Sequence, residues 1–321
     1  MKTFTISEND SGQRLDRFLS KAVPNLPSSL VQRYIRIKRI KINNKRAHNS
    51  DMLEKGDVVD CYVNDEFFAQ KPDQDRFLRS KRDLDIFYED ENLIILNKPV
   101  GLSVHDDNTN DTDTLINRVK LYLFSSGKYC PDDENSFAPA LCNRIDRNTE
   151  GIVLCAKNAA TLRVMNLIIK ERLIRKYYLC VVHGIPKPKS GKLKHFLRKD
   201  SQQNQVKVFD HPIADGLSAI TDYKVLESRH EFSLVEVELH TGRTHQIRAQ
   251  MAYIGHPLLG DTKYGLAKEN KNTGFKYQAL CAYAVEIHAG DNAEHLSYLN
   301  GKRFELPDID FVNRFKRGEI K

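Results

Sequence analysis

Three long segments rich in β-branched and aromatic residues constrain the fold of this 321-residue chain most strongly. Residues 174–182, 217–226 and 232–239 are bounded by turn formers, and each is long enough to cross a large sheet. Shorter strand-type segments precede them at residues 86–88, 93–96 and 152–156. Amphipathic segments after Thr114 and Asn158, both good N-caps, predict helices between the strands. The pattern indicates an α+β domain built around one large mixed sheet.

The N-terminal 64 residues are predicted to form a separate, small α/β domain. Apolar residues at helical spacing predict one helix in Leu15–Ala22, and Ser28 or Ser29 can cap a second. Short strands are expected at residues 40–42 and 58–63.

This N-terminal segment also carries most of the chain's positive charge. It holds twelve Lys/Arg and seven Asp/Glu, so five of the seven net positive charges of the chain lie there. Such a run is often only a solvated helix face. Here, however, two arginines share one helical face that leads into a basic turn and strand, which favours RNA backbone binding. The predicted RNA-binding residues are Arg33, Arg36, Lys38, Arg39 and Lys41.

Residues 65–82 are polar and charged, without sustained periodicity, and are predicted to be a linker. The linker is either a flexible hinge or a strap anchored by its aromatic residues. The second domain is assigned to residues 83–306, and residues 307–321 are expected to be a polar tail.

Composition limits the function classes. The net charge of +7 at pH 7 suits an acidic partner such as nucleic acid. The six cysteines include no Cys-x-x-Cys pair, which favours reduced thiols over zinc or a disulfide framework. No signal core and no segment long enough to span a membrane is found. The expectation is a cytoplasmic monomer with no membrane association.

A single carboxylate, Asp146, stands between two arginines in the segment 143–151, which reads Asn-Arg-Ile-Asp-Arg-Asn-Thr-Glu-Gly. A short apolar strand follows at once, so Asp146 is predicted on a loop that feeds a rigid strand, a frequent place for a reactive group. On local grounds alone, an ordinary surface turn with an Asp–Arg pair is the commoner explanation of such a segment.

The segment after Leu239 predicts a helix that presents polar residues near its start. Gly242 ends a strand and Thr244 is the predicted N-cap. The core side of this helix is formed by Ile247, Met251 and Ile254. His245 and Arg248, three residues apart, share a different face. The spacing of the nearby histidines fits no helical metal pair, so no metal site is expected.

Five segments together resemble the RluA-type family of pseudouridine synthases, in the family's order and over roughly two-thirds of the chain. The resemblance is carried by residues 87–102 with Asn-Lys-Pro-x-Gly, 143–151, 176–184 with Lys-x-Tyr, 241–248 with Thr-Gly-Arg-Thr-His-Gln-Ile-Arg, and 259–265. It implies a mixed, mainly antiparallel sheet with a central cleft. The N-terminal segment resembles the S-four-type RNA-binding module that often precedes this domain.

The resemblance also implies a function. The chain is expected to isomerise uridines in RNA to pseudouridine without cofactor or metal, and large-subunit ribosomal RNA is the favoured substrate. Asp146 is the expected catalytic carboxylate, with Arg248 keeping it ionised and Tyr178 supporting the flipped base. Substrate-binding roles are expected for Arg144, Lys176, Arg243 and His245.

The chain departs from the commoner family pattern at Asn143, Ile145 and Glu150, which concerns the choice of uridine more than the chemistry. Two alternatives remain open: the same chemistry on transfer RNA, and a non-catalytic RNA-binding ribosome assembly factor. A hydrolase is disfavoured because no second carboxylate stands out as a partner for Asp146.

Overall fold

The structure, a computed structural model, describes residues 1–69, 75–106, 111–200, 202–203, 205–265, 268, 270 and 273–320. The chain divides into two compact units. Unit 1 combines Met1–Leu84 with Asn108–Ala140 and Ala156–Arg163, and unit 2 holds Asp85–Asp107, Leu141–Cys155 and Val164–Lys321. The domain boundaries predicted from the sequence stay a proposal, because a compact unit reflects contacts and not independent folding.

The N-terminal part of unit 1 contains a four-stranded antiparallel sheet in the order β1-β4-β2-β3. Its elements are β1 (Lys2–Thr5), α1 (Leu15–Ala22), α2 (Ser28–Arg36), β2 (Ile40–Ile42), β3 (Lys45–Arg46) and β4 (Val58–Cys61). Both helices bury apolar faces, including Phe18 of α1 and Ile35 of α2, against this sheet. The expected serine cap is wrong. Pro27 is the N-cap of α2 and its φ of −57° suits a helix start, while no side chain caps the helix.

Aromatic residues anchor both described parts of residues 65–82 within unit 1, and the choice between hinge and strap stays a prediction. These parts contain the short 3-10 helices η1 (Asp65–Phe68) and η2 (Arg76–Arg79), whereas residues 70–74 of the predicted linker lie outside the described residues. Phe67 and Phe68 pack on the N-terminal core. Phe77 is 3% exposed, and its ring centroid lies 5.7 Å from that of Phe124 in α3 (Leu115–Ser125).

Unit 2 is organised by an eleven-stranded sheet, whose main path runs β11-β10-β12-β13-β9-β14-β8-β6-β5. Its strands are β5 (Ile86–Glu89), β6 (Leu93–Lys98), β7 (Ala140–Leu141), β8 (Glu150–Ala156), β9 (Ile174–His183), β10 (Ser190–Asp200), β11 (Gln205–Phe209), β12 (Leu217–Arg229), β13 (Phe232–Leu239), β14 (Leu280–Ile287) and β15 (Arg303–Glu305). The β8–β14 pair is parallel, and the strand pairs from β11 through to β14 are antiparallel. The predicted mixed, mainly antiparallel α+β fold is confirmed, whereas the central cleft stays a prediction.

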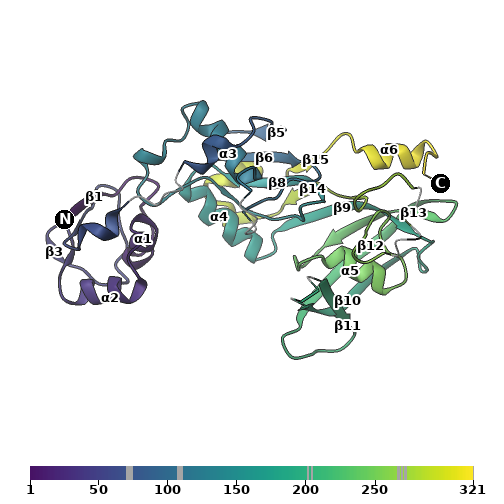
Figure 1. Ribbon diagram of the computed structural model, residues 1–321, viewed down its shortest axis with the longest axis horizontal. Helices are drawn as coiled ribbons and strands as arrows, with labels where there is room; N and C mark the ends of the chain where they lie inside the picture. The colour runs from purple at the N-terminus through teal and green to yellow at the C-terminus, as the bar shows by residue number, and fades with distance from the viewer. Residues whose placement is uncertain are drawn as a thin grey trace. The chain divides into compact units, whose positions relative to one another are not determined.

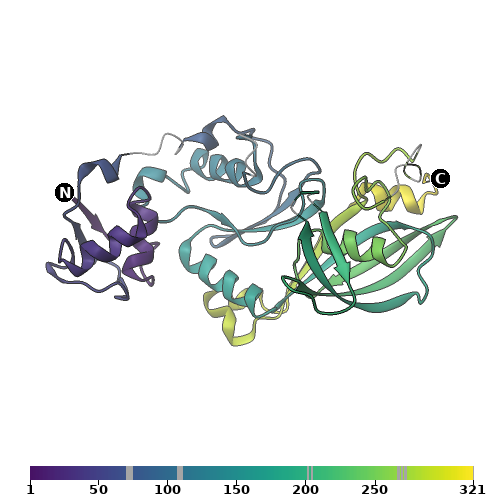
Figure 2. The ribbon, with the colours of Figure 1, turned by 60° about the horizontal axis from the view of Figure 1, so that its bottom comes forward.

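Helices cover both faces of this sheet. Along β9, Leu179 belongs to one core cluster and Tyr178 to another, and neighbouring strand residues point to opposite faces. The Leu179 face is covered by α4 (Ala159–Lys170), the 3-10 segment η4 (Gly290–Leu299) and α6 (Asp310–Lys316). Figure 2 shows the yellow η4 beside the teal α4. On the Tyr178 face lies α5 (Gln246–Tyr253), next to the strands β10 to β12 in Figure 1.

The predicted polar tail is wrong for residues 307–320. Phe311, Val312 and Phe315 of α6 are buried in the core of unit 2. The apolar residues are few and closely grouped, so the segment reads as polar on average although one helical face is hydrophobic.

The cysteines and helix lengths complete the description. All six cysteines are free thiols, and four of them are buried. Within the ranges that the structure describes, no helix is both long enough and apolar enough to cross a membrane.

Candidate active site

Asp146 lies on the loop that connects β7 to β8. A turn is closed by the Thr149 N–H, which donates to the Asp146 carbonyl at 3.0 Å. Gly151 then enters β8 with φ +119°, and a Cβ there would lie 2.3 Å from the Ala282 carbonyl of β14. Only glycine at position 151 therefore allows β8 to pack this closely against β14, and the Asp146 loop leads directly into β8. The side chain of Asp146 remains 27% exposed, so a substrate can reach it.

Asn143 fastens the start of the same loop. Its side-chain carbonyl accepts from the Leu154 N–H at 2.8 Å, and its amide donates to the Ile152 carbonyl at 3.3 Å. Both partners belong to β8. This departure from the family pattern thus holds the loop on the neighbouring strand, a role that a local reading of the sequence does not reveal.

Lys98, in the Asn-Lys-Pro segment, anchors the other side of the loop. It is completely buried, and its ammonium donates to the carbonyls of Pro99 at 2.8 Å, Leu102 at 2.9 Å and Arg147 at 2.9 Å. Burial lowers the pKa of Lys98 to about 7, although the Asp146 and Glu150 carboxylates oppose this. Lys98 was not predicted as part of the site, because its only signal in the sequence is a lysine between a strand and a proline.

Arg248 of α5 bridges two carboxylates. Its Nη1 donates to Asp146 Oδ2 at 2.8 Å, while Nε and Nη2 donate to the two oxygens of Asp261 at 2.7 and 3.0 Å. Arg248 is 7% exposed and Asp261 is fully buried. Burial alone lowers the pKa of Arg248, but the bonds and charges of Asp261 and Asp146 raise it above its ordinary value. The two-pronged bond to Asp261 fixes the guanidinium plane and thereby directs Nη1 at Asp146.

Asp261 is the second partner that the sequence analysis did not single out. Burial raises its pKa, but Arg248 and the backbone N–H groups of Lys263 and Tyr264 lower it below its ordinary value. Those two N–H groups donate to Oδ1 at 2.9 and 3.1 Å. Asp261 is therefore a buried, ionised support for Arg248.

The start of α5 differs from the prediction. Thr244 is not the cap; the N-cap is His245, in the left-handed conformation with φ 51°, and no side chain caps the helix from that position. The side-chain carbonyl of Gln246 instead accepts from the Arg243 N–H at 3.0 Å and from the Thr241 hydroxyl at 2.8 Å. These bonds run from the turn to a side chain inside the helix, opposite to an ordinary N-cap. They hold the turn before α5 and so orient the side chain of His245.

His245 and Tyr264 form a chain that ends at Asp146. The Tyr264 hydroxyl accepts from the Val206 N–H at 2.8 Å, so its own hydrogen can go to His245 Nδ1, 2.9 Å away. The hydrogen of the neutral imidazole is then assigned to Nε2, which lies 3.9 Å from Asp146 Oδ2. Burial lowers the pKa of His245 despite the nearby Asp146 carboxylate, which favours this neutral form. The Tyr264 ring also lies 5.3 Å from the Arg248 guanidinium carbon.

Tyr178 of β9 lies on the same face of the sheet as α5. It is 7% exposed, and burial, followed by the charge of Asp146, raises its pKa. Lys176, two residues earlier on the same strand, is half-buried, and burial lowers its pKa. These placements bring Tyr178, His245, Arg248 and Asp146 into one site.

The remaining predicted substrate residues are less closely involved. Arg144 is exposed on the Asp146 loop. Arg243 is half-buried and its Nε donates to the Ser218 carbonyl of β12 at 3.1 Å. In unit 1, Arg33, Arg36, Lys38 and Arg39 are exposed and Lys41 is half-buried, lying 5.6 Å from the Tyr62 ring.

Glu150, one of the departures from the family pattern, places a second negative charge near Asp146. The Nε of the neighbouring Arg147 donates to the Gly101 carbonyl at 2.9 Å. Burial raises the pKa of Glu150, the Asp310 carboxylate raises it further, and Lys98 opposes the rise. Lys98 is therefore the cation that faces both Glu150 and Asp146.

Comparisons with known proteins identify the family of the chain. Residues 92–253 match the RNA pseudouridylate synthase family and residues 13–59 match the S4 domain. An uncharacterized RNA pseudouridine synthase of Bacillus subtilis is 33% identical over 92% of both chains. The ribosomal large subunit pseudouridine synthase C of Vibrio cholerae is 34% identical over 88% of this chain and 86% of that protein.

A solved structure has the same fold. Human RNA pseudouridylate synthase domain containing 4 aligns with a TM-score of 0.56 at 21% identity, over 74% of this chain and 94% of the human chain. The matched family segment includes Asp146, Tyr178 and Arg248, while Asp261 and Tyr264 lie beyond its end. With an S4 domain ahead of this segment, the chain belongs to the RluA-type family of RNA pseudouridine synthases.

Proposed function

We propose that Asp146 is the catalytic carboxylate, and that the enzyme modifies uridines of large-subunit ribosomal RNA. The observation that carries the first part is the Arg248 bridge. One carboxylate of the bridge, Asp261, is sealed in the core, whereas the other, Asp146, is partly exposed and adjoined by Tyr178 and His245. A positioned and accessible carboxylate is what a nucleophile or proton acceptor requires.

The reaction breaks the bond from ribose C1′ to N1 of uracil and forms a bond from C1′ to C5. The proton on C5 leaves and N1 is protonated, so substrate and product are isomers and no oxidant or co-substrate enters the balance. Asp146 attacks either C1′ or the base, or it removes a ribose proton on a glycal route. Tyr178, which lies on the α5 face of the sheet, supports the flipped base, and its hydroxyl serves the C5 proton.

Ribosomal RNA is the proposed substrate because a similar protein is named a ribosomal large subunit synthase and the S4 domain precedes the catalytic part. Transfer RNA is the second candidate substrate. A non-catalytic assembly factor is the rival of a different class, and it would need no carboxylate directed at an open site.

Tritium release from RNA labelled at C5 of uridine tests the proposal. The purified protein is incubated with transcripts of large-subunit ribosomal RNA and, separately, of transfer RNA. Stoichiometric release from the ribosomal transcript is expected. Release only from transfer RNA would show that transfer RNA, and not ribosomal RNA, is the substrate. RNA binding without any release would favour the assembly factor.

The exposed arginines of α2 are expected to supply affinity and not chemistry. Changing Arg33 and Arg36 to alanine should weaken RNA binding and lower the slope of log Kd against log salt by about 1.4–1.8. At saturating RNA the rate should stay unchanged. These substitutions are preferable to removing residues 1–64, because Asp10 bonds to Asn135 and Ser136 of the same unit. An unchanged salt slope would contradict this role.

Tyr264→Phe is expected to reduce the rate at saturating RNA by roughly tenfold, the scale of one hydrogen bond in a site. The variant keeps the ring over Arg248 but removes the hydroxyl that fixes the His245 tautomer. His245 should then also bind a proton at a different pH, so the acid limb of the pH–rate profile should move. A lowered rate with an unmoved acid limb would show that Tyr264 serves only the fold.

A further inference from the structure

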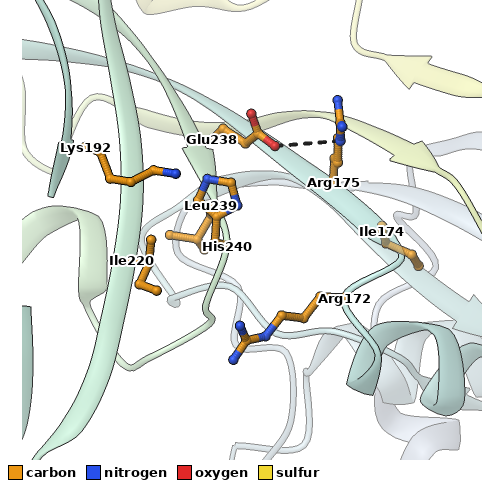
Figure 3. A pocket seen from close by; sticks show the side chains of 8 residues that line it. All are labelled: Arg172, Ile174, Arg175, Lys192, Ile220, Glu238, Leu239 and His240. Carbon is orange, nitrogen blue, oxygen red and sulfur yellow. Dashed lines mark ion pairs between the residues drawn. The ribbon is translucent and has the colours of Figure 1, made fainter. Parts of the chain in front are cut away.

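A pocket of about 210 Å³ opens in unit 2 at the end of the central strands (Figure 3). Its walls come from β9, β10, β12 and β13 and from the turn after α4. The lining residues are Arg172, Ile174, Arg175, Lys192, Ile220, Glu238, Leu239 and His240. None of them belongs to the Asp146 site. In Figure 3, the Lys192 ammonium and the Arg172 guanidinium reach in from different elements on either side of His240.

Arg172 occupies a backbone position that favours glycine. Its φ is +61°, and it follows the end of α4, where the Arg172 and Leu173 N–H groups donate to the carbonyls of Ile169 and Ile168 at 3.1 and 2.8 Å. This pair of bonds is the helix-ending motif in which the left-handed residue is usually glycine. A cation near a helix C-terminus is favourable, but Lys170 in the last turn already provides one. The left-handed backbone at Arg172 therefore costs free energy that a glycine would not, and this cost can be separated by experiment from what the side chain contributes.

The charges of the pocket leave Arg172 as the excess cation. Lys192 Nζ lies 3.3 Å from Asp222 Oδ2, and Arg175 Nε lies 3.9 Å from Glu238 Oε1. Among the described residues, no carboxylate pairs with Arg172. Three permanent cations thus face two carboxylates, and Arg172 is available to an anion from outside.

A metal site is the competing interpretation of the same walls. Asp222, Glu238 and His240 offer ligand atoms within 4.8 Å of one another. However, His240 Nε2 lies 2.9 Å from Asp222 Oδ2, and Lys192 and Arg175 already neutralise the two carboxylates. A divalent cation would have to displace these groups and would be repelled by Arg172. The charges favour an anion.

We propose that this pocket binds a backbone phosphate of the substrate RNA, with Arg172 as its principal ligand and Lys192 and His240 beside it. The proposal rests on RNA being the substrate. Glu238 is opposite Tyr177 in the register of β13 and β9, so Glu238 and its partner Arg175 lie on the face of the sheet that Tyr178 does not occupy. The bound phosphate would therefore belong to a nucleotide that passes this second face, away from the flipped uridine. Such a contact positions the RNA without reading its sequence.

Arg172→Gly is the decisive variant, because it removes the cation and relieves the backbone at once. It should raise Tm by about 2–4 °C. RNA affinity should nevertheless fall by about tenfold, and the slope of log Kd against log salt should decrease by about 0.7–0.9. Arg172→Lys should keep most of the salt slope at unchanged Tm. Binding is measured in the Asp146→Asn background, so that its result does not depend on turnover, while tritium release by the wild type tests the proposed function separately.

Two matched controls define the result. His230→Gly relieves another exposed left-handed residue (φ 52°), on the β12–β13 turn outside the pocket, and should raise Tm without weakening binding. Lys302→Ala removes an exposed charge that lines no wall of the pocket and should leave the salt slope unchanged. An unchanged affinity for Arg172→Gly, or an equal loss in Lys302→Ala, would overturn the proposal. Stoichiometric binding of Zn²⁺ that His240→Ala abolishes would also overturn it, in favour of a cation site.

Discussion

Asp146→Asn is expected to lower pseudouridine formation to background, a loss on the order of 10⁴-fold or more. The substitution is nearly isosteric, and the carbonyl oxygen of the introduced amide can still accept from Arg248 Nη1, so the fold should be retained. An amide is a poor nucleophile and a poor proton acceptor, which is why turnover should stop on each of the three possible routes. Tritium release under single-turnover conditions measures the effect.

RNA binding supplies the control for this variant. Phosphate contacts elsewhere carry the affinity, so Kd should change by no more than about threefold. Circular dichroism and Tm should match the wild type. Residual turnover in protein free of wild-type contamination would refute a catalytic role for Asp146. A parallel loss of binding and activity would instead assign it to RNA recognition.

Arg248→Ala is expected to destabilise the protein severely, by about 3–5 kcal/mol, because it leaves the fully buried Asp261 carboxylate without its cation. The sequence suggested that Arg248 serves mainly to keep Asp146 ionised. The geometry shows that Arg248 also stabilises the fold, because two of its three donating nitrogens bond to Asp261. Activity should therefore be lost together with stability, and thermal unfolding measures the second effect.

The stability lost in Arg248→Ala is expected to depend on pH. In the wild type the pKa of Asp261 is lowered in the folded state, so its contribution to stability is present above the ordinary value of 3.8 and is lost as pH falls through the folded value. In Arg248→Ala, burial should raise that pKa instead, and the variant should become relatively more stable as pH falls. The difference in unfolding free energy should thus be largest near neutral pH.

A second substitution separates stability from catalysis. Adding Asp261→Asn to Arg248→Ala removes the stranded charge and should recover part of the lost stability. It should not recover activity, because Asp146 still lacks its positioning partner. Equal Tm values for Arg248→Ala and the wild type would show that Asp261 tolerates the loss of its cation and would contradict this account.

Local patterns in the sequence predicted part of the secondary structure, whereas β10, β14 and α6 were not predicted and the site residues were proposed from the resemblance. The long strands were located correctly, because strand residues of two faces and turn formers leave a short-range signal. The Thr114 cap was also correct, and its hydroxyl accepts from the Asn117 N–H. Asp146 and Arg248 could be paired from the resemblance, and the structure places them in contact.

Only the tertiary structure decided what supports these residues. Asp261 lies 13 residues from Arg248, and the Arg147 carbonyl lies 49 residues from Lys98. The Val206–Tyr264–His245 chain joins a sheet edge to the site across 58 residues. Such partners depend on the order of strands in the sheet, which the pattern within a single segment does not encode. The errors have the same origin: α6 is held by the core it packs on, and the turn before α5 is held by Gln246 and not by the residue that local preference favours.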